Sequence, residues 1–373
     1  MKQVKELKGR VASLDILRGF DMFLLLFFQP VLVHFGRVAD LPWLNDILYQ
    51  FEHETWEGFR AWDMIMPLFM FMVGTSMPFS FAKFLNGNNR RALYIKILKR
   101  VALLYIFGMI VQGNLLSLDT HSIRLYSNTL QAIAAGYLIA AVIKLNLSIR
   151  KQLMATLALM IIYWIPMTFC GDFTPENNFA EAVDRIVLGR FRDGVHWDDS
   201  GIWHFSEWYT YTWIWSSLTF GATVMLGVFA GQIIKRSTDK GHTFVMLALA
   251  GVICIVLGLV WGLQMPIIKR LWTSSMTLFA GGISFLLMAV FYFWIDYKGH
   301  SKGLNWLKIY GANAITAYVI GEVINFRSVV SSVSFGLQPI LGDYYQVWLT
   351  FGNYMILFLI LYYMYRQRIF LKL

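Results

Sequence analysis

The sequence predicts an all-α polytopic membrane protein with about ten transmembrane helices, and three features of its composition support this. Of its 373 residues, 57% are apolar and only 14% are charged. A soluble domain carries about 25% charged residues, so this chain has about half the charge needed to cover a surface that faces water. About 20 apolar residues cross the ~30 Å hydrocarbon core of a bilayer, and the apolar residues suffice for about ten such crossings. Soluble globular and disordered classes are excluded.

Apolar runs place the helices along the chain in order. The first 13 residues are basic, as at the start of a signal peptide. The apolar run that follows contains Asp15, Arg18 and Asp21 and has no cleavage site between small residues, so we expect a retained first helix. The predicted spans are 14–36, 58–82, 98–117, 127–145, 152–170, 210–234, 242–263, 272–295, 306–325 and 345–365.

The distribution of basic residues predicts the side that each loop faces. Cytoplasmic loops of membrane proteins carry an excess of Lys and Arg. With a cytoplasmic N-terminus, 23 of the 32 basic residues of this chain fall on the cytoplasmic side. We therefore expect both termini inside, little extramembrane structure, and one membrane domain over 1–373, with longer outer segments at 37–57 and 171–209.

The distribution of charge argues against nucleic-acid binding, and the cysteine content argues against a disulfide or a metal site. The net charge is +10, but the basic residues form short clusters between apolar runs and not a continuous stripe that could follow a nucleic acid. Membrane lipids are the expected partners of such clusters. The two cysteines, Cys170 and Cys254, have no ligand or pairing spacing, so neither a disulfide nor a metal site is expected.

Ionisable residues inside predicted spans are functional candidates because their burial in a bilayer is costly. They are Asp15, Arg18, Asp21, Asp63 and Glu322. Asp15, Arg18 and Asp21 are three residues apart, so Arg18 is able to pair with either neighbour. Two interpretations stay open: a structural ion pair at the cytoplasmic mouth, or a guanidinium that faces an anionic ligand.

His53 lies at the outer end of the second span, among Glu52, Glu54 and Glu57. Neighbouring carboxylates raise the basicity of a histidine and fix its tautomer, which suits a general base; an interfacial histidine is the alternative. Asp63 follows ten residues later, about 15 Å along a regular helix. We therefore expect Asp63 to be too far away to contact His53 directly, and assign it to positioning.

Three further groups of polar residues are candidates. The hydroxyls of Thr273, Ser274 and Ser275 either cap a helix or line a polar passage. Asn313 is an uncharged hydrogen-bonding residue in the ninth span, and Glu322 near its outer end is able to meet His53 if the helices adjoin. Aromatic residues between 196 and 215, Trp203 among them, lie near carboxylates in a manner that suits a sugar ring.

The residues of several blocks resemble one family of membrane enzymes. The opening RVASLDILRG at 10–19 has the pattern R-x-x-S-x-D-x-x-R-G. His53, Trp56, Gly58, Asp63 and Pro67 have the spacing H-x-x-W-x-G-x4-D-x3-P. Further blocks are LWTSS at 271–275, preceded by Pro266 and Lys269, then Asp296 with Lys298 and Gly299, and Gly311 with Asn313, Tyr318 and Glu322. Together they resemble the transmembrane acyltransferase family that includes heparan-alpha-glucosaminide N-acetyltransferase and its bacterial relatives.

This resemblance implies an enzyme that takes acetyl from cytoplasmic acetyl-CoA and delivers it to an acceptor across the membrane. The family acceptor is a terminal glucosamine, and the histidine that matches His53 is the catalytic one, as base or transient acetyl carrier. Asn313 and the 273–275 hydroxyls are then candidates to stabilise the thioester carbonyl. Acetyl-CoA is the co-substrate, and an extracytoplasmic amino sugar or glycan such as heparan sulfate is the acceptor. The resemblance is also compatible with a homodimer, and we expect the bacterial inner (cytoplasmic) membrane.

The resemblance and the residues together assign candidate sites. Candidates for the co-substrate are Arg10, Ser13, Asp15, Arg18, Arg100, Trp272, Ser274 and Ser275, with Lys96 an alternative to Arg100 near the nucleotide. Candidates for the acceptor are Gln29, Glu54, Trp56, Trp203 and Glu322. The sequence departs from the family at three places. Gln29-Pro30 stands where the glucosamine enzyme has an asparagine, and Ala132 stands where the family motif L-Q-R-I has an arginine. An aromatic-rich stretch near Tyr209 replaces the D-P-E-G-type segment before the sixth span.

Two other functions stay open. In a multi-pass transporter of an anionic or sugar solute, Asp21, Asp63 and Glu322 would act as proton relays. The sequence shows no internal repeat of the kind found in many transporters. A non-catalytic membrane assembly subunit is the third possibility and predicts no binding of coenzyme A.

Overall fold

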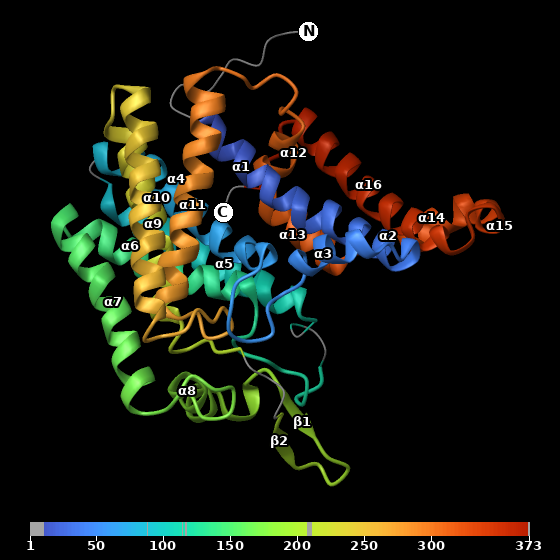
Figure 1. Ribbon diagram of the computed structural model, residues 1–373, viewed down its shortest axis with the longest axis horizontal. Coiled ribbons are helices and arrows are strands. Elements are labelled where there is room, and N and C mark those ends of the chain that lie inside the picture. Colours follow the sequence, from blue (N-terminus) through green and yellow to red (C-terminus); the bar gives the residue numbers. More distant parts are fainter. Residues whose placement is uncertain (1–10, 88, 114, 116–117, 207–210, 372–373) are drawn as a thin grey trace.

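The computed structural model describes residues 11–371 except 88, 114, 116–117 and 207–210, and it shows a bundle of long helices (Figure 1). Arg10 and the basic residues before it lie outside the described residues. The helices of the first half are α1 (Ala12–Phe23), the π-helix Leu24–Phe28, α2 (Gln29–Ala39), α3 (Pro42–Gln50), the 3-10 turn Ala61–Met64, α4 (Ile65–Asn86), α5 (Arg90–Val111), α6 (Thr129–Asn146), α7 (Ile149–Phe169), α8 (Phe179–Leu188) and the 3-10 turn Gly189–Phe191.

The second half adds a small hairpin and the remaining helices. Strands β1 (Val195–Trp197) and β2 (Trp203–Phe205) pair antiparallel, with Trp197 opposite Trp203. The helices are α9 (Ser217–Arg236), α10 (Lys240–Gly262), α11 (Ser274–Phe291), the π-helix Tyr292–Tyr297, α12 (Leu307–Ala312), α13 (Ala314–Val323), α14 (Arg327–Ser334), the 3-10 turn Phe335–Leu337, α15 (Gln338–Leu341), the 3-10 turn Gly342–Tyr344 and α16 (Tyr345–Arg366).

The predicted class, an all-α polytopic membrane protein, is confirmed. Eight helical segments among the described residues are long and apolar enough to cross a membrane. Long, uninterrupted apolar runs form helices because a helix satisfies every backbone hydrogen bond without water. The eight segments are Ala12–Ala39, Ala61–Asn86, Thr129–Asn146, Ile149–Phe169, Ser217–Arg236, Lys240–Gly262, Ser274–Tyr297 and Arg327–Arg366.

The other two predicted spans are helical but differ from a simple apolar crossing. The span 98–117 falls on α5, whose first half carries basic residues, Lys96, Lys99 and Arg100 among them. The span 306–325 is divided into α12 and α13 by a break at Asn313, whose φ is −127° and ψ 39°. Charge in one case and a backbone break in the other explain why an apolar window alone overestimated these crossings.

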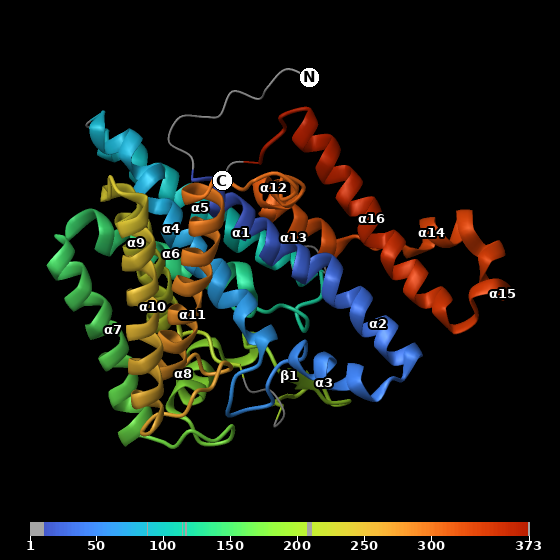
Figure 2. The same cartoon turned by 45° about the horizontal axis from the view of Figure 1, so that its top comes forward.

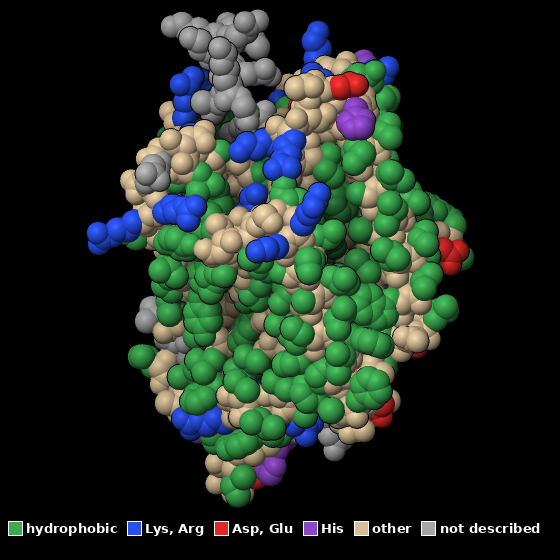
Figure 3. All heavy atoms as spheres, turned by 90° about the vertical axis from the view of Figure 1, so that its left-hand side faces the viewer, with side chains coloured by type: hydrophobic (Ala, Val, Ile, Leu, Met, Phe, Trp, Pro, Cys, Tyr) green, Lys and Arg blue, Asp and Glu red, His purple; other side chains and the backbone are tan. Residues whose placement is uncertain are grey.

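The two ends of the bundle differ in the way that the predicted topology requires. Helix α1 begins and α16 ends at one end, whereas α8 and the β1–β2 hairpin lie at the other (Figure 2). Lys and Arg side chains gather above a broad hydrophobic band, at the end where the chain begins (Figure 3). We call the end with α8 and the hairpin the outer end. Both outer segments are more ordered than loops, since α3 lies within 37–57, and α8 and the hairpin lie within 171–209.

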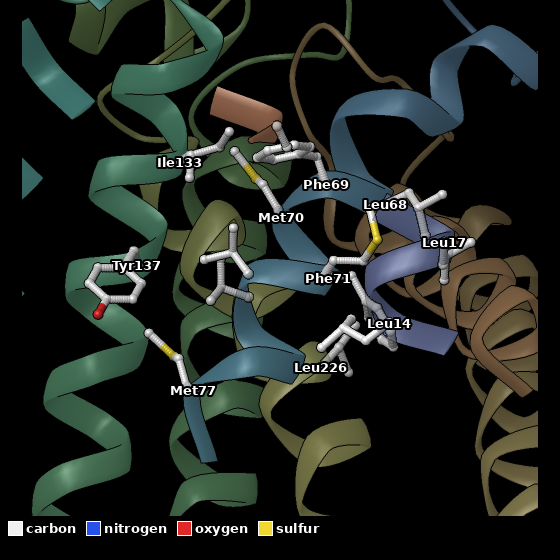
Figure 4. Close-up of a cluster of buried hydrophobic side chains, with 14 of the residues drawn as sticks. Leu14, Leu17, Leu68, Phe69, Met70, Phe71, Met77, Ile133, Tyr137 and Leu226 are labelled. Carbon is white, nitrogen blue, oxygen red and sulfur yellow. The ribbon is translucent and has the colours of Figure 1, made fainter. Parts of the chain in front are cut away.

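The core of the bundle is a close seam between α4 and α9. A Cβ atom added to Gly74 would lie 1.9 Å from the carbonyl oxygen of Val224, and one added to Gly227 would lie 1.9 Å from that of Phe71. Small residues allow helix backbones to approach this closely in membranes, where dispersion contacts drive association. Around the seam, buried side chains of α1, α4, α6 and α9 meet in one cluster (Figure 4). The outer end of α4 is therefore held firmly.

Candidate active site

A cavity of about 370 Å³ opens at the outer end of the bundle, and we call it the outer cavity. Its walls come from α1 and the π-helix after it, from α4, α6, α9 and α13, and from the segments that precede α4, α9 and α11. Most of its floor is apolar, and its polar groups are few, as is usual in ligand sites. It is lined by Met22, Leu25, His53, Trp62, Ile65, Met66, Phe69, Ser127, Asn128, Thr129, Leu130, Ile133, Asp193, Tyr211, Thr212, Trp213, Phe220, Lys269, Arg270, Trp272, Tyr318 and Glu322.

His53 and Asp63 are in direct contact at this cavity. The Nδ1 atom of His53 lies 2.8 Å from Oδ1 of Asp63. The expected separation of about 15 Å along one helix is wrong, because residues 53–60 form an irregular loop and α4 begins only after the 3-10 turn Ala61–Met64. Gly58 has a φ of +127°, a conformation that side chains disfavour, and it turns the loop back over Asp63.

Asp63 organises the whole loop that carries His53. Its Oδ2 accepts hydrogen bonds from the backbone N–H of Glu54, at 3.2 Å, and of Arg60, at 3.0 Å. The guanidinium of Arg60 in turn donates to both carboxylate oxygens of Glu54, at 2.9 and 3.1 Å. The Asp63 side chain is fully buried, whereas that of His53 is 40% exposed. Because an ionised carboxylate only accepts hydrogen bonds, the contact with Asp63 favours the tautomer of His53 that carries its proton on Nδ1 and leaves Nε2 as the basic atom.

Lys269 reaches the same pair from the segment between α10 and α11. Its Nζ lies 2.8 Å from Nδ1 and 3.3 Å from Nε2 of His53, and 3.4 Å from Oδ1 of Asp63. The two segments are tied together by their backbones, since the N–H of Gly58 donates to the carbonyl of Ile267 at 2.9 Å and Glu57 bridges Ile268. The site is therefore assembled from residues about 200 positions apart.

Burial governs the protonation of both basic groups. Burial lowers the pKa of Lys269 to about 8, even though the Asp63 carboxylate acts in the opposite direction. The pKa of His53 is lowered from its ordinary value, first by burial and then by the charges of Lys269 and Arg270, against the opposing hydrogen bond to Asp63. At neutral pH His53 is thus mainly the uncharged imidazole.

The hydroxyls of residues 273–275 hold the Lys269 segment in place. Thr273 caps α11 by accepting from the N–H of Met276 at 3.4 Å and donates to the carbonyl of Pro266 at 2.9 Å. Ser275 donates to the carbonyl of Pro266 at 3.1 Å, and Ser274 to that of Met160 at 2.9 Å. The capping interpretation fits this geometry. None of the three hydroxyls lines the outer cavity, and their assignment to the thioester stays a prediction.

Trp272, unlike the three hydroxyl residues that follow it, reaches the outer cavity. It lines the outer cavity, and its indole N–H donates to the hydroxyl of Thr223 at 2.9 Å. Its φ of +55° is rare for a bulky residue and marks a tight turn at this point. Among the described co-substrate candidates, Trp272 is the one that lines the outer cavity together with His53.

Asn313 does not line the outer cavity, and its role at the thioester carbonyl stays a prediction. Its side-chain amide donates to the carbonyl of Ile369 at 3.0 Å and accepts from the N–H of Leu371 at 3.1 Å. The residue is 2% exposed. Both of its polar atoms hold the segment after α16 against the break between α12 and α13, so the structure supports a structural role.

The remaining co-substrate candidates lie on α1 and α5. Asp15 and Arg18 form an ion pair with a separation of 3.7 Å. The start of α1 is capped by Asp296, which accepts from the N–H groups of Ala12 at 3.3 Å and Ser13 at 3.1 Å. A carboxylate at this position favours the positive end of the helix dipole. The structure therefore accounts for the Asp296 block of the sequence by helix capping.

Two ionisable residues lie within the bundle: Arg100 is half-buried and Asp21 is buried. The Arg100 guanidinium lies over the ring of Tyr137, 4.6 Å from its centre, and its Nε has no hydrogen-bond partner among the described residues. Asp21 is fully buried, and neither of its oxygens has such a partner within the same residues. Neither residue lines the outer cavity.

The acceptor candidates divide into one cavity residue and four others. Glu322 lines the outer cavity, on the wall formed by α13. Gln29 donates to the carbonyl of Phe51 at 3.3 Å and Trp56 to that of Phe173 at 2.7 Å, so both support the surrounding loops. Glu54 is engaged with Arg60, and Trp203 is part of strand β2 in the hairpin and not of a loop.

Sequence reasoning missed the other charged residues of the cavity. Asp193 and Arg270 line it together with Lys269. The adjacent basic pair Lys269–Arg270, on the side where few basic residues were expected, was the available signal. Asp193 carried no comparable signal, because it lies in a long outer segment with many acidic residues.

Comparisons with known proteins agree with the motifs. A family model described as heparan-alpha-glucosaminide N-acetyltransferase, catalytic, matches residues 10–180. Heparan-alpha-glucosaminide N-acetyltransferase of Homo sapiens is 25% identical over 374 residues, which cover 86% of this chain and 54% of that protein. The protein of the same name in Mus musculus is 24% identical over 368 residues, with 85% and 54% covered. The chain thus spans about half the length of these relatives, and the predicted resemblance is confirmed.

Proposed function

We propose that this protein is a transmembrane acetyltransferase that moves acetyl from cytoplasmic acetyl-CoA to an amine on the other side of the membrane. The observation that carries the proposal is the His53–Asp63 pair, 2.8 Å apart, at a cavity on the end opposite the basic face. The likeness to N-acetyltransferases supports the reaction class. The amine of a terminal glucosamine is the proposed acceptor, on a glycan such as heparan sulfate.

In this proposal His53 is the group that does chemistry and Asp63 the group that orients it. Asp63 fixes the Nδ1–H tautomer, so Nε2 is available to take a proton from the acceptor as its nitrogen attacks the thioester carbonyl. The alternative is that Nε2 itself attacks the carbonyl and carries the acetyl group transiently. Both routes need the same uncharged imidazole.

The co-substrate would approach from the basic end. Arg10, Ser13, Asp15, Arg18 and Arg100 remain the proposed contacts of coenzyme A at that side, because guanidinium groups suit phosphates. Trp272 is the proposed contact near the thioester, since it lines the cavity. The inner membrane of a bacterium is the proposed location.

The test is acetyl transfer by the purified protein. With radiolabelled acetyl-CoA and a glucosamine-terminated oligosaccharide, we expect label in the oligosaccharide, and replacement His53→Ala to reduce transfer by at least about 100-fold. His242→Ala, at an exposed histidine at the start of α10, is the matched control and should transfer at the wild-type rate. Equal transfer by the His53→Ala variant would remove His53 from the reaction, and no transfer by the wild type to any acceptor would contradict the function.

A further inference from the structure

Lys269 has a contact that the proposed mechanism does not use. Its side chain is 9% exposed, and its Nζ lies within 2.8 to 3.4 Å of both ring nitrogens of His53 and of the Asp63 carboxylate. It lines the outer cavity and is held there by the backbone pairing of residues 57–58 with 267–268. An amine in this position is able to exchange a proton with an acceptor that is bound in the cavity next to His53.

The chemistry of the acceptor sets how many proton-accepting groups a site needs. A hydroxyl acceptor has one proton to lose, and a single base suffices. An alkyl amine is an ammonium ion near neutral pH, so it has to lose one proton before its nitrogen has a free electron pair and a second one after attack. Two adjacent basic groups therefore suit an ammonium acceptor.

We propose that Lys269 takes the first proton of a cationic amine acceptor, so that the site is built for transfer to nitrogen and not to oxygen. This inference rests on the proposed acetyltransferase function. It gives Lys269 a catalytic role beside His53 and names the acceptor class as primary ammonium compounds, amino sugars among them.

The step balances as follows for direct transfer. Neutral Lys269 removes one proton from R–NH3⁺ and becomes the ammonium ion. The nitrogen of R–NH2 attacks the carbonyl carbon of acetyl-CoA, the new C–N bond forms, and the second proton passes to Nε2 of His53. The C–S bond breaks, the sulfur leaves as the thiolate of coenzyme A, and it takes the proton from His53. The proton on Lys269 is released to solvent, which restores the site.

The charges around Lys269 permit this cycle. It faces His53 from the 51–60 loop and Asp63 from the turn before α4, with Arg270 beside it. Asp193 and Glu322 line the same cavity from the turn before β1 and from α13. Burial lowers the pKa of Lys269 to about 8, so about a tenth of the side chains are neutral at pH 7 and half at pH 8. Arg270 favours the neutral form further, and Asp63 opposes it.

The test compares Lys269→Arg and Lys269→Met with the wild type on two acceptors. Arginine keeps the positive charge next to Asp63 but does not release its proton, and methionine fills a similar volume without charge. With glucosamine as acceptor at pH 7, both variants should lose about ten-fold in kcat/KM, because only about a tenth of this amine is neutral in solution at that pH. With methoxyamine, which is already neutral at this pH, the loss should be less than about two-fold. Lys302→Met, at an exposed lysine near the opposite end, is the matched control.

A pH series with glucosamine sharpens the result. The deficit of the Lys269→Arg variant should shrink as the pH rises past about 8, because the amine of glucosamine, which the neighbouring oxygens make less basic than an alkyl amine, then loses its first proton in solution. An equal deficit for both acceptors at every pH would show a merely structural lysine and overturn the proposal, as would the absence of any deficit. If either of these results is found while the wild-type protein transfers acetyl to amines, only the role of Lys269 is overturned, and the proposed acetyltransferase function stands. A wild-type protein inactive toward every acceptor overturns both.

Discussion

The middle of α4 and its outer end are built on opposite principles. In the middle, Gly74 meets α9 with backbone against backbone, and the neighbouring side chains are apolar and buried. At the outer end, in the 3-10 turn that leads into α4, Asp63 is just as buried but contacts His53, Lys269 and two backbone N–H groups. One helix thus joins a dry seam to a polar cluster about three turns away.

This difference indicates a division of labour along α4. A charged group is tolerated at a buried position only when its hydrogen bonds are satisfied, and Asp63 meets that condition through residues of two segments, the 53–60 loop and the segment before α11. The close seam with α9 keeps α4 from shifting, so the carboxylate stays within reach of His53. Damage to the seam should remove the folded protein, whereas damage to the cluster should remove activity first.

The largest effect is expected at the seam itself. In a Gly227→Leu variant the new Cβ would lie 1.9 Å from the carbonyl oxygen of Phe71, so α4 and α9 have to separate. We expect a loss of at least about 3 kcal/mol in the free energy of unfolding, enough to abolish a monodisperse peak in size-exclusion chromatography of the detergent-solubilised protein. Gly336→Leu is the control, because a Cβ there has no atom within 4 Å. A well-folded Gly227→Leu protein would show that the seam is not what fixes α4.

The next largest effect is expected at the carboxylate. An Asp63→Asn variant loses the charge that holds the Nδ1–H tautomer of His53, and kcat/KM for acetyl transfer should fall by about 10² to 10⁴. The pH dependence tests the cause. Asp63 raises the pKa of His53 against the lowering by burial, so its removal lowers that pKa further. In the proposed mechanism uncharged His53 is the active form and is lost as the pH falls, so the acid limb of the rate profile should move to lower pH.

A matched change separates this role from simple destabilisation. Glu54→Gln removes a carboxylate from the same loop but leaves the contact between His53 and Asp63 in place. Its acid limb should stay where the wild type has it. An unchanged acid limb in Asp63→Asn would show that Asp63 does not act on His53.

Much of this architecture could be predicted from the sequence, because long apolar runs indicate directly where the membrane-crossing helices lie. His53 and Asp63 were both identified, but their contact was not. Ten residues on one helix separate two side chains by about 15 Å, and the prediction placed the start of that helix at residue 58. The turn at Gly58 and the 3-10 turn Ala61–Met64 removed the helix between them.

Contacts between distant segments were beyond sequence reasoning for a different reason. Lys269 lies 216 residues from His53, and hydropathy says nothing of which loops adjoin at the outer end. Asn313 shows the reverse case: its polar side chain in an apolar span suggested chemistry, but it binds the backbone of residues 369 and 371. A buried amide at a helix break is satisfied by the nearest free backbone groups.

The smallest of these effects is expected at the edge of the cluster. Trp56→Phe keeps the aromatic ring but removes the N–H that donates to the carbonyl of Phe173 at 2.7 Å. A lost hydrogen bond of this kind costs about 1 kcal/mol, so a small fall in the melting temperature is expected with kcat unchanged. If Trp56 also contacts the acceptor sugar, Trp56→Ala should raise KM for the acceptor without changing kcat. A fall in kcat for Trp56→Phe alone would mean that the loop anchored at Phe173 holds His53 in its reactive position, which would extend the polar cluster beyond Asp63.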